Sequence, residues 1–162
     1  MSPICVQGSC GAALSALVLA SPAFGQRANV LTASEIAALL PGKVLTYRND
    51  KRMVGEPKNP AVWVPRSDGS HAIVQFNLRP DHSVQIRCTS FARDGSKRPC
   101  PGFAANDVGV WSVEADAVCL QWLNWGSSVK RCYRLRREGE GFRAEQVSGG
   151  ASSMDDTLVY IK

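Results

Sequence analysis

The sequence predicts a mainly β protein, folded as a small antiparallel up-and-down β-barrel of about eight strands with one short N-terminal helix. From residue 43 onward, short runs of alternating polar and apolar residues follow one another and are separated by turn residues. Before them, one segment at 31–42 has the apolar spacing of a helix. Small residues expected on the inner face, such as Ala72, Gly109 and Ala117, favour the tight curvature of a barrel over a flat sandwich.

Residues 1–25 have the pattern of a secretory signal peptide. The run 11–20 is apolar, and the small residues Ala23 and Gly25 after it are typical of a cleavage site. The run is too short to span a bilayer. No Lys or Arg precedes it, so a buried N-terminal helix is the alternative interpretation. We expect cleavage after Gly25, a single β-barrel-like domain at 26–162, and a periplasmic or secreted protein.

Four cysteines lie in the expected mature domain: Cys88, Cys100, Cys119 and Cys132. An even number of cysteines in an exported domain predicts two disulfides. Three pairings are possible, and the local one, 88 with 100 and 119 with 132, is favoured by the strand register described next. Because neither a Cys-x-x-Cys motif nor a nearby pair of histidines accompanies them, we predict no metal site and no cofactor.

The clearest strand pattern surrounds the last two cysteines. With the turn at 125–126, residues 117–123 pair with 128–134, which places Cys119 opposite Cys132 at a separation that a disulfide can span. The preceding strand folds back onto this hairpin. One face then collects eight apolar side chains, Trp111, Val113, Val118, Leu120, Trp122, Val129, Tyr133 and Leu135. A slip of one residue would mix this face with the polar one, so the pattern supports the register.

Local signals predict the other elements. Thr32 and Glu35 have the spacing of a capping box, and residues 41–42 are the Pro-Gly pair that ends the helix. Residues 43–49 alternate as a first strand. Residues 50–60 contain two prolines and mixed charges and are expected to form a loop.

An Asp-Gly pair at 68–69 separates two alternating runs, 61–66 and 71–79, and predicts a hairpin between them. The second run then pairs with the strand after it. The inward pairs of that hairpin are Leu78 with Val84, Phe76 with Ile86, and Val74 with Cys88. Residues 93–107 form a long loop that contains one cysteine, and two strands at 142–147 and 157–162 close the chain.

No set of residues typical of an active site stands out. His71 falls at the start of a strand, and His82 falls in a turn next to Asp81, where neighbouring side chains point apart more often than they cooperate. The cysteines are expected to be oxidised, which removes a thiolate nucleophile. We therefore predict a protein that is not an enzyme.

One basic residue breaks the apolar face of the central hairpin. Arg131 falls opposite Leu120, near Trp111, Trp122 and Tyr133. A buried arginine must be paired or must line a cavity, and barrels of about eight strands can hold one small ligand. These four residues, Trp111, Trp122, Arg131 and Tyr133, are therefore predicted to bind a small anionic or amphipathic ligand. The alternatives are a register bulge or an edge arginine whose head group reaches water.

A second hypothesis is a protein-interaction module, such as an inhibitor or an envelope-associated factor. Its predicted surface combines one strand face with the 93–107 loop and consists of Arg93, Lys97, Arg98, Lys130, Arg134 and Arg136. Such a surface suits an acidic protein. It equally describes a solvated strand face balanced by nearby glutamates. The aromatic residues point to the opposite face, so nucleic acid is not expected as a partner.

The opening LTASEIAALLPGK at 31–43, together with WSVEADAVCL at 111–120 and CYRL at 132–135, resembles a group of small exported proteobacterial proteins of unknown function. The resemblance covers most of the mature chain. It implies a periplasmic β-rich domain and brings no activity with it. Lipocalins are a looser comparison, because their Gly-x-Trp motif belongs to the first strand, whereas Gly-Val-Trp here lies at 109–111.

Overall fold

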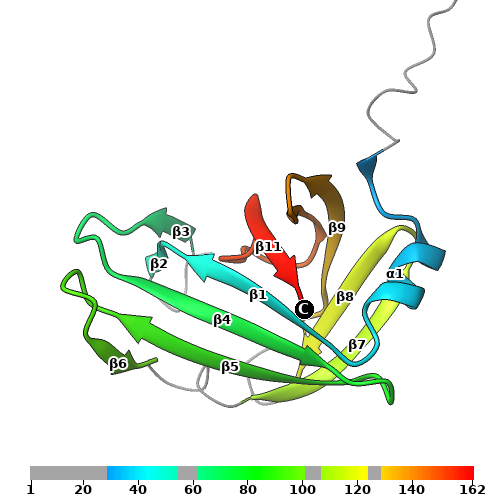
Figure 1. The fold of residues 1–162 in the computed structure, drawn as a ribbon, viewed down its shortest axis with the longest axis horizontal. Coiled ribbons are helices and arrows are strands. Elements are labelled where there is room, and N and C mark those ends of the chain that lie inside the picture. Colours follow the sequence, from blue (N-terminus) through cyan, green and yellow to red (C-terminus); the bar gives the residue numbers. More distant parts are fainter. Residues whose placement is uncertain (1–28, 55–61, 101–106, 124–128) are drawn as a thin grey trace, which may run out of the picture.

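The chain folds into a closed, eight-stranded antiparallel barrel, as the sequence predicted (Figure 1). The structure, a computed structural model, describes residues 29–54, 62–100, 107–123 and 129–162. The barrel strands, in order around the barrel, are β1 (Lys43–Asn49), β4 (His71–Leu78), β5 (Ser83–Phe91), β7 (Val108–Glu114), β8 (Ala117–Trp122), β9 (Arg131–Glu138), β10 (Gly141–Ser148) and β11 (Thr157–Ile161). Pairing of β11 with β1 closes the sheet and leaves these strands without free edges.

Three short strands extend one end of the barrel. β2 (Lys51–Val54) and β3 (Val62–Pro65) pair only with each other, and β6 (Lys97–Pro99) pairs with the end of β5. Figure 1 shows these strands at one end of the molecule and the helix α1 (Ala33–Leu39) at the other.

Helix α1 closes its end of the barrel. The predicted capping box is present, because Glu35 N donates to Thr32 Oγ1 at 3.3 Å and Thr32 N donates to Glu35 Oε2 at 2.8 Å. Ile36 is fully buried, and Arg137 of β9 forms a 3.0 Å ion pair with Glu35. The N–H of Ala33 donates to the carboxylate of Asp116 at the β7–β8 turn. These contacts hold the helix over the apolar interior.

The predicted register around the central hairpin is confirmed. Cys119 pairs with Cys132, and both disulfides, Cys88–Cys100 and Cys119–Cys132, are formed. The β8–β9 ladder ends at the pair of Leu120 with Arg131, so the expected pairing of Trp122 with Val129 does not occur and Val129 is exposed. The expected turn at 125–126 lies outside the described residues.

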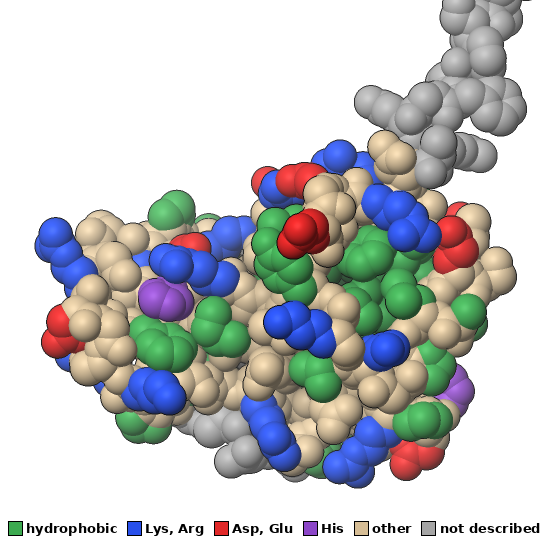
Figure 2. All heavy atoms as spheres, in the orientation of Figure 1, with side chains coloured by type: hydrophobic (Ala, Val, Ile, Leu, Met, Phe, Trp, Pro, Cys, Tyr) green, Lys and Arg blue, Asp and Glu red, His purple; other side chains and the backbone are tan. Residues whose placement is uncertain are grey.

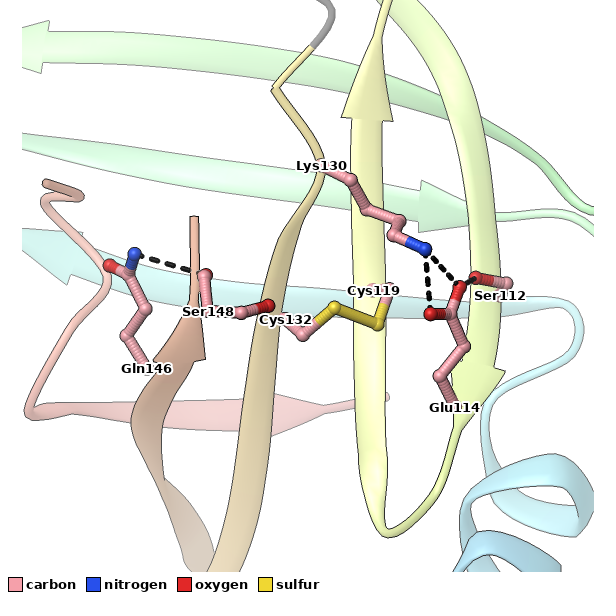
Figure 3. The surroundings of a disulfide bond; sticks show 7 residues. All are labelled: Ser112, Glu114, Cys119, Lys130, Cys132, Gln146 and Ser148. Atoms are coloured by element: carbon pink, nitrogen blue, oxygen red, sulfur yellow. Dashed lines mark hydrogen bonds and ion pairs between the residues drawn. A yellow bond between two sulfur atoms is a disulfide. The ribbon is translucent and has the colours of Figure 1, made fainter. Parts of the chain in front are cut away.

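Figure 3 shows the Cys119–Cys132 bridge between β8 and β9, beside the ion pair of Lys130 with Glu114. With Ala117, this disulfide forms a small buried cluster that is separate from the barrel core. Ala117 therefore lies on the outer face, and its assignment to the inner face was wrong. Side chains alternate along β8, so Val118 and Leu120 point inward while Ala117 and Cys119 point outward.

The predicted hairpin between 61–66 and 71–79 was also wrong. The 68–69 turn exists, and Gly69 has the positive φ of +73° that such a turn needs. However, β4 pairs with β1 on one edge and with β5 on the other, so it has no edge left for β3. β3 pairs with β2 instead, which places a strand inside the segment 50–60 that was expected to be a loop. Likewise β6 lies within the expected loop 93–107.

The two disulfides are consistent with an oxidising location outside the cytoplasm. Among the described residues, no helix is long and apolar enough to cross a bilayer. The expected signal segment 1–25 lies outside the described residues.

Candidate ligand-binding cavity

A cavity of about 590 Å³ lies inside the end of the barrel that is remote from α1. This volume falls in the range of small-molecule sites, roughly 300–1,000 Å³. Among the described residues that line it, the exposed ones are Arg52, Met53 and Ala151. The cavity therefore opens to solvent between β2 and the segment 149–154, and we call this opening the mouth.

The inner wall of the cavity is apolar. It is built by inward-facing residues of three barrel strands, Ala72, Val74, Phe76, Ile86, Leu120 and Trp122. The rings of Phe76 and Trp122 are 5.3 Å apart, and each is 5% exposed. Strand alternation explains why these residues share one side, because every second residue of a barrel strand points inward.

Hydroxyl groups border the apolar wall. The hydroxyls of Tyr47 and Ser153 are hydrogen-bonded at 3.0 Å, and Tyr133 donates to Ser152 Oγ at 2.6 Å. Burial raises the pKa of Tyr133 to about 12, and burial likewise raises the pKa of Tyr47. Both phenols therefore stay neutral at physiological pH and remain hydrogen-bonding groups on the cavity wall.

Three arginines line the cavity, and none of the described residues that line it is Asp or Glu. Arg131 lies opposite Leu120 on the inner face of β9, and its Nε donates to the Gly150 carbonyl at 3.3 Å. Arg66 donates from Nε to the Lys51 carbonyl at 3.1 Å. Arg52 is exposed at the mouth. The site therefore carries an excess of positive charge, which favours anions.

The segment 149–154 packs directly on the stem of Arg131. A Cβ at Gly149 would lie 2.7 Å from Arg131 Cγ and 2.7 Å from the Lys130 carbonyl oxygen. Gly149 also has a φ of +92°, which disfavours any other residue. This glycine lets the segment approach the arginine closely and orient it.

Three of the four residues predicted to bind a ligand line this cavity, namely Trp122, Arg131 and Tyr133. The structure places Trp111 elsewhere, so its assignment to the cavity is corrected. Its indole N–H donates to the Arg79 carbonyl at 2.8 Å, and its ring lies 4.9 Å from the ring of His82. A buried indole needs a hydrogen-bond acceptor, and the turn after β4 supplies one.

Sequence reasoning missed several cavity residues. Tyr47 could have been found, because it alternates with Leu45 on the inner face of β1. Trp63 belongs to a ribbon that the sequence did not predict. Ser152 and Ser153 lie in a polar segment with no periodicity, and nothing local indicates that this segment folds over a barrel end.

The basic residues predicted as an interaction surface do not form one patch. Lys130 pairs with Glu114 at 2.6 Å, and Arg136 pairs with Glu145 at 3.0 Å. Arg134 is exposed on the same strand face. The other three, Arg93, Lys97 and Arg98, are on or beside β6, and strands β5, β7 and β8 lie between β6 and β9. Arg93 and Arg98 border a shallow depression together with Asp68 and Asp94. Lys97 is the first residue of β6. Neighbouring carboxylates thus offset much of the positive charge.

Neither histidine lies at the cavity. His71 stacks on Phe91, with ring centroids 5.1 Å apart, and His82 lies against Trp111. Within the described part of the chain, the group that could hold a metal ion consists of Glu114, Cys119 and Cys132. Both of its sulfurs are bonded to each other, so they offer no thiolate ligand.

The chain was compared with protein-family models, with curated proteins and with solved structures, and none of them matches it. Because one fold supports many functions, the chemistry of the cavity is a better guide to function than the barrel architecture.

Proposed function

We propose that this protein is an exported, non-enzymatic binding protein for a small amphipathic anion. The observation that carries the proposal is the cavity, which has an apolar inner wall and three arginines. None of the described residues that line it is Asp or Glu. An apolar ligand body would lie against Phe76 and Trp122. The anionic head group would lie at Arg131, beside the hydroxyls of Tyr133 and Ser152.

Arg131 is the best placed of the three arginines. It projects from the inner face of a barrel strand, and its side chain is held by the 149–154 segment. Arg52 is exposed on β2, and Arg66 donates to the Lys51 carbonyl and to Ser70 Oγ. A preoriented guanidinium loses less freedom when it binds an anion, and charge-assisted hydrogen bonds are stronger than neutral ones.

The proposed location is the periplasm or the cell exterior, consistent with the disulfides and with the signal-like segment 1–25. A closed up-and-down barrel with a cavity at one end is also the architecture by which lipocalins hold ligands. The alternative, a protein-interaction module that uses the basic strand face, has less support, because Lys130 and Arg136 are paired with glutamates.

The direct test is a titration with four ligands that share one alkyl chain. Octanoate and octanesulfonate are anionic, octanol is neutral and octylamine is cationic. Trp122 and Trp63 line the cavity, so bound ligand should change the tryptophan fluorescence. We expect the two anions to bind at least about tenfold more tightly than the alcohol or the amine, because only they pair with the arginines. Equal affinity for all four would contradict an anion-binding site.

Replacing Arg131 tests the position of the head group. We expect Arg131→Gln to weaken octanesulfonate binding about tenfold to a hundredfold, because a hydrogen bond to a charged group contributes roughly 1.5–3 kcal/mol. Arg134→Gln is the matched control, since this residue lies on the same strand but is exposed on the outer face. Isothermal titration calorimetry measures both. An equal loss in the two variants would show a general charge effect and would count against the assigned position.

The pH dependence of binding shows whether the ligand or the protein is the group that titrates. Burial raises the pKa of both cavity phenols, Tyr47 and Tyr133. The pKa of Tyr133 reaches about 12, because burial is the main cause and the negative charge of Asp155 adds to it. Arginine stays charged throughout. Octanoate is anionic only above its own pKa of roughly 4–5, so its affinity should fall as the pH drops through that range. Octanesulfonate remains anionic, and its affinity should stay constant. A parallel fall for both ligands would show that the protein itself titrates.

A further inference from the structure

The ribbon formed by β2 and β3 exposes apolar side chains on both of its faces. Met53 pairs with Trp63, and Val54 pairs with Val62. Met53, Val54 and Val62 are 56%, 45% and 55% exposed. The two strands contain six apolar residues and two basic ones, Lys51 and Arg52, and no acidic residue. Exposed apolar surface of this kind marks a place where another surface binds.

The ribbon is anchored to the cavity mouth. Lys51 Nζ donates to the Asp155 carbonyl at 2.6 Å, and Arg66 N donates to the Asp50 carbonyl at 2.7 Å. Arg52, Met53 and Trp63 also line the cavity. The ribbon therefore borders the proposed ligand site, whereas Val54 and Val62 do not line it.

We propose that the β2–β3 ribbon docks on an anionic lipid surface and so places the cavity mouth at the bilayer. The exposed side chains of Met53, Val54 and Val62 suit the acyl boundary. Lys51 and Arg52 supply positive charge for the head groups. Trp63 suits this boundary, because an indole has an apolar body and a polar N–H. A docked protein could take its ligand directly from the bilayer, and this consequence rests on the proposed function. The docking itself does not depend on that function.

Charge complementarity favours a lipid surface over a second copy of this chain. A symmetric contact through this ribbon would bring the basic residues of both copies, Lys51 and Arg52, into one interface, and neither strand has an acidic residue to pair with them. Figure 2 shows that, on the face drawn, Lys and Arg side chains are more widespread than Asp and Glu side chains. The chain as a whole carries a formal charge of +5, which also favours an anionic surface.

The test is co-sedimentation of the full chain with two kinds of vesicle. One kind is phosphatidylcholine alone, and the other contains about 30% phosphatidylglycerol, enough to give a negative surface. We expect partitioning onto the anionic vesicles that is about tenfold stronger than onto the neutral ones and that weakens with added salt. Equal binding to both vesicles, or no binding to either, would overturn the proposal.

Paired variants locate the docking surface. V54Q/V62Q removes apolar exposure from the ribbon without touching the cavity, and vesicle binding should fall about tenfold. V108Q/V110Q changes two β7 valines of similar exposure, 45% and 48%, and should leave binding unchanged. Equal loss in both variants, or loss in neither, would contradict a docking ribbon. A monomer–dimer equilibrium abolished by V54Q/V62Q would instead identify a second copy as the occupant.

Titration of the same variants with octanesulfonate, without vesicles, separates the two proposals. Unchanged affinity in V54Q/V62Q shows an intact fold and an intact cavity, so a loss of vesicle binding then belongs to the ribbon. If the unmodified chain binds octanesulfonate but does not bind vesicles, the docking proposal fails and the cavity proposal stands. If it binds anionic vesicles and no octyl ligand, the docking surface stands and the proposed ligand site fails.

Discussion

Removing the Cys88–Cys100 bridge with C88A/C100A is expected to lower the free energy of unfolding by about 3 kcal/mol and to weaken ligand binding at the same time. The loop that this bridge closes has a sequence separation of 12 residues, and loop closure in the unfolded chain sets the size of the loss. The affinity for octanesulfonate should fall because both cysteines line the cavity. The bridge also holds Cys100, the residue after β6, against Cys88 of β5.

The second disulfide provides the matched control. Cys119–Cys132 has a sequence separation of 13 residues, so C119A/C132A should cost a similar amount of stability. This bridge lies in a separate cluster on the outer face and does not line the cavity (Figure 3). Octanesulfonate affinity should therefore remain unchanged in C119A/C132A.

Urea unfolding gives the two stabilities, and calorimetry gives the two affinities under conditions where both variants are folded. The informative quantity is the difference between the variants. Equal losses of affinity would show that binding follows overall stability and that the Cys88–Cys100 bridge has no particular place in the site. An unchanged affinity in C88A/C100A would lead to the same conclusion.

Gly109→Ala is expected to destabilise the barrel by about 3 kcal/mol, although it adds a single methyl group. Gly109 lies on the inner face of β7, opposite Trp122. A Cβ there would overlap the backbone oxygen of Gln121 and would lie 3.0 Å from Cε3 of Trp122. The backbone of β8 is held close to β7 at this point by the pairing of Val110 with Gln121 and of Gly109 with Trp122, so the two strands must separate to admit the methyl group.

Gly150→Ala is the control for this substitution, because nothing lies within 4 Å of a Cβ at that position. It should change the free energy of unfolding by less than about 0.5 kcal/mol. Urea midpoints at constant slope measure both variants. A stable Gly109→Ala protein with an unchanged Trp122 environment, seen in near-ultraviolet circular dichroism, would mean that β7 and β8 do not approach each other this closely.

The sequence predicted most of the barrel because its signals are local. Val118 and Leu120 occupy every second position of one strand, as Tyr133 and Leu135 do on the next, and the facing positions of Cys119 and Cys132 set the register between them. The capping box of Thr32 and Glu35 depends on residues within one helical turn. Where a signal was ambiguous, the prediction was wrong. The Asp-Gly turn at 68–69 was interpreted as a hairpin turn, although turn residues specify a change of direction and not the partner of the next strand.

The candidate site depends less on local pattern. Arg131 was noticed because it interrupts an apolar face, and Trp122 and Tyr133 share that face. By themselves, these residues did not show whether the barrel is open or filled at that end. Trp111 has the same alternation and lies at the closed end, because its indole N–H reaches the Arg79 carbonyl. Depth along the barrel axis depends on the tilt and stagger of the strands, which alternation does not report.

By itself, the sequence determined the fold class, the helix, the strand register around the cysteines and both disulfides, because each depends on residues that are near in sequence or on a strict period of two. The tertiary structure alone decided that one barrel end is plugged by α1 while the other holds a cavity. It also decided that Ser152 and Ser153 bind the hydroxyls of Tyr133 and Tyr47 at the cavity wall, and that β2 pairs with β3 beside the mouth. These features join segments far apart in the chain, and packing the closed barrel, not local propensity, selects them.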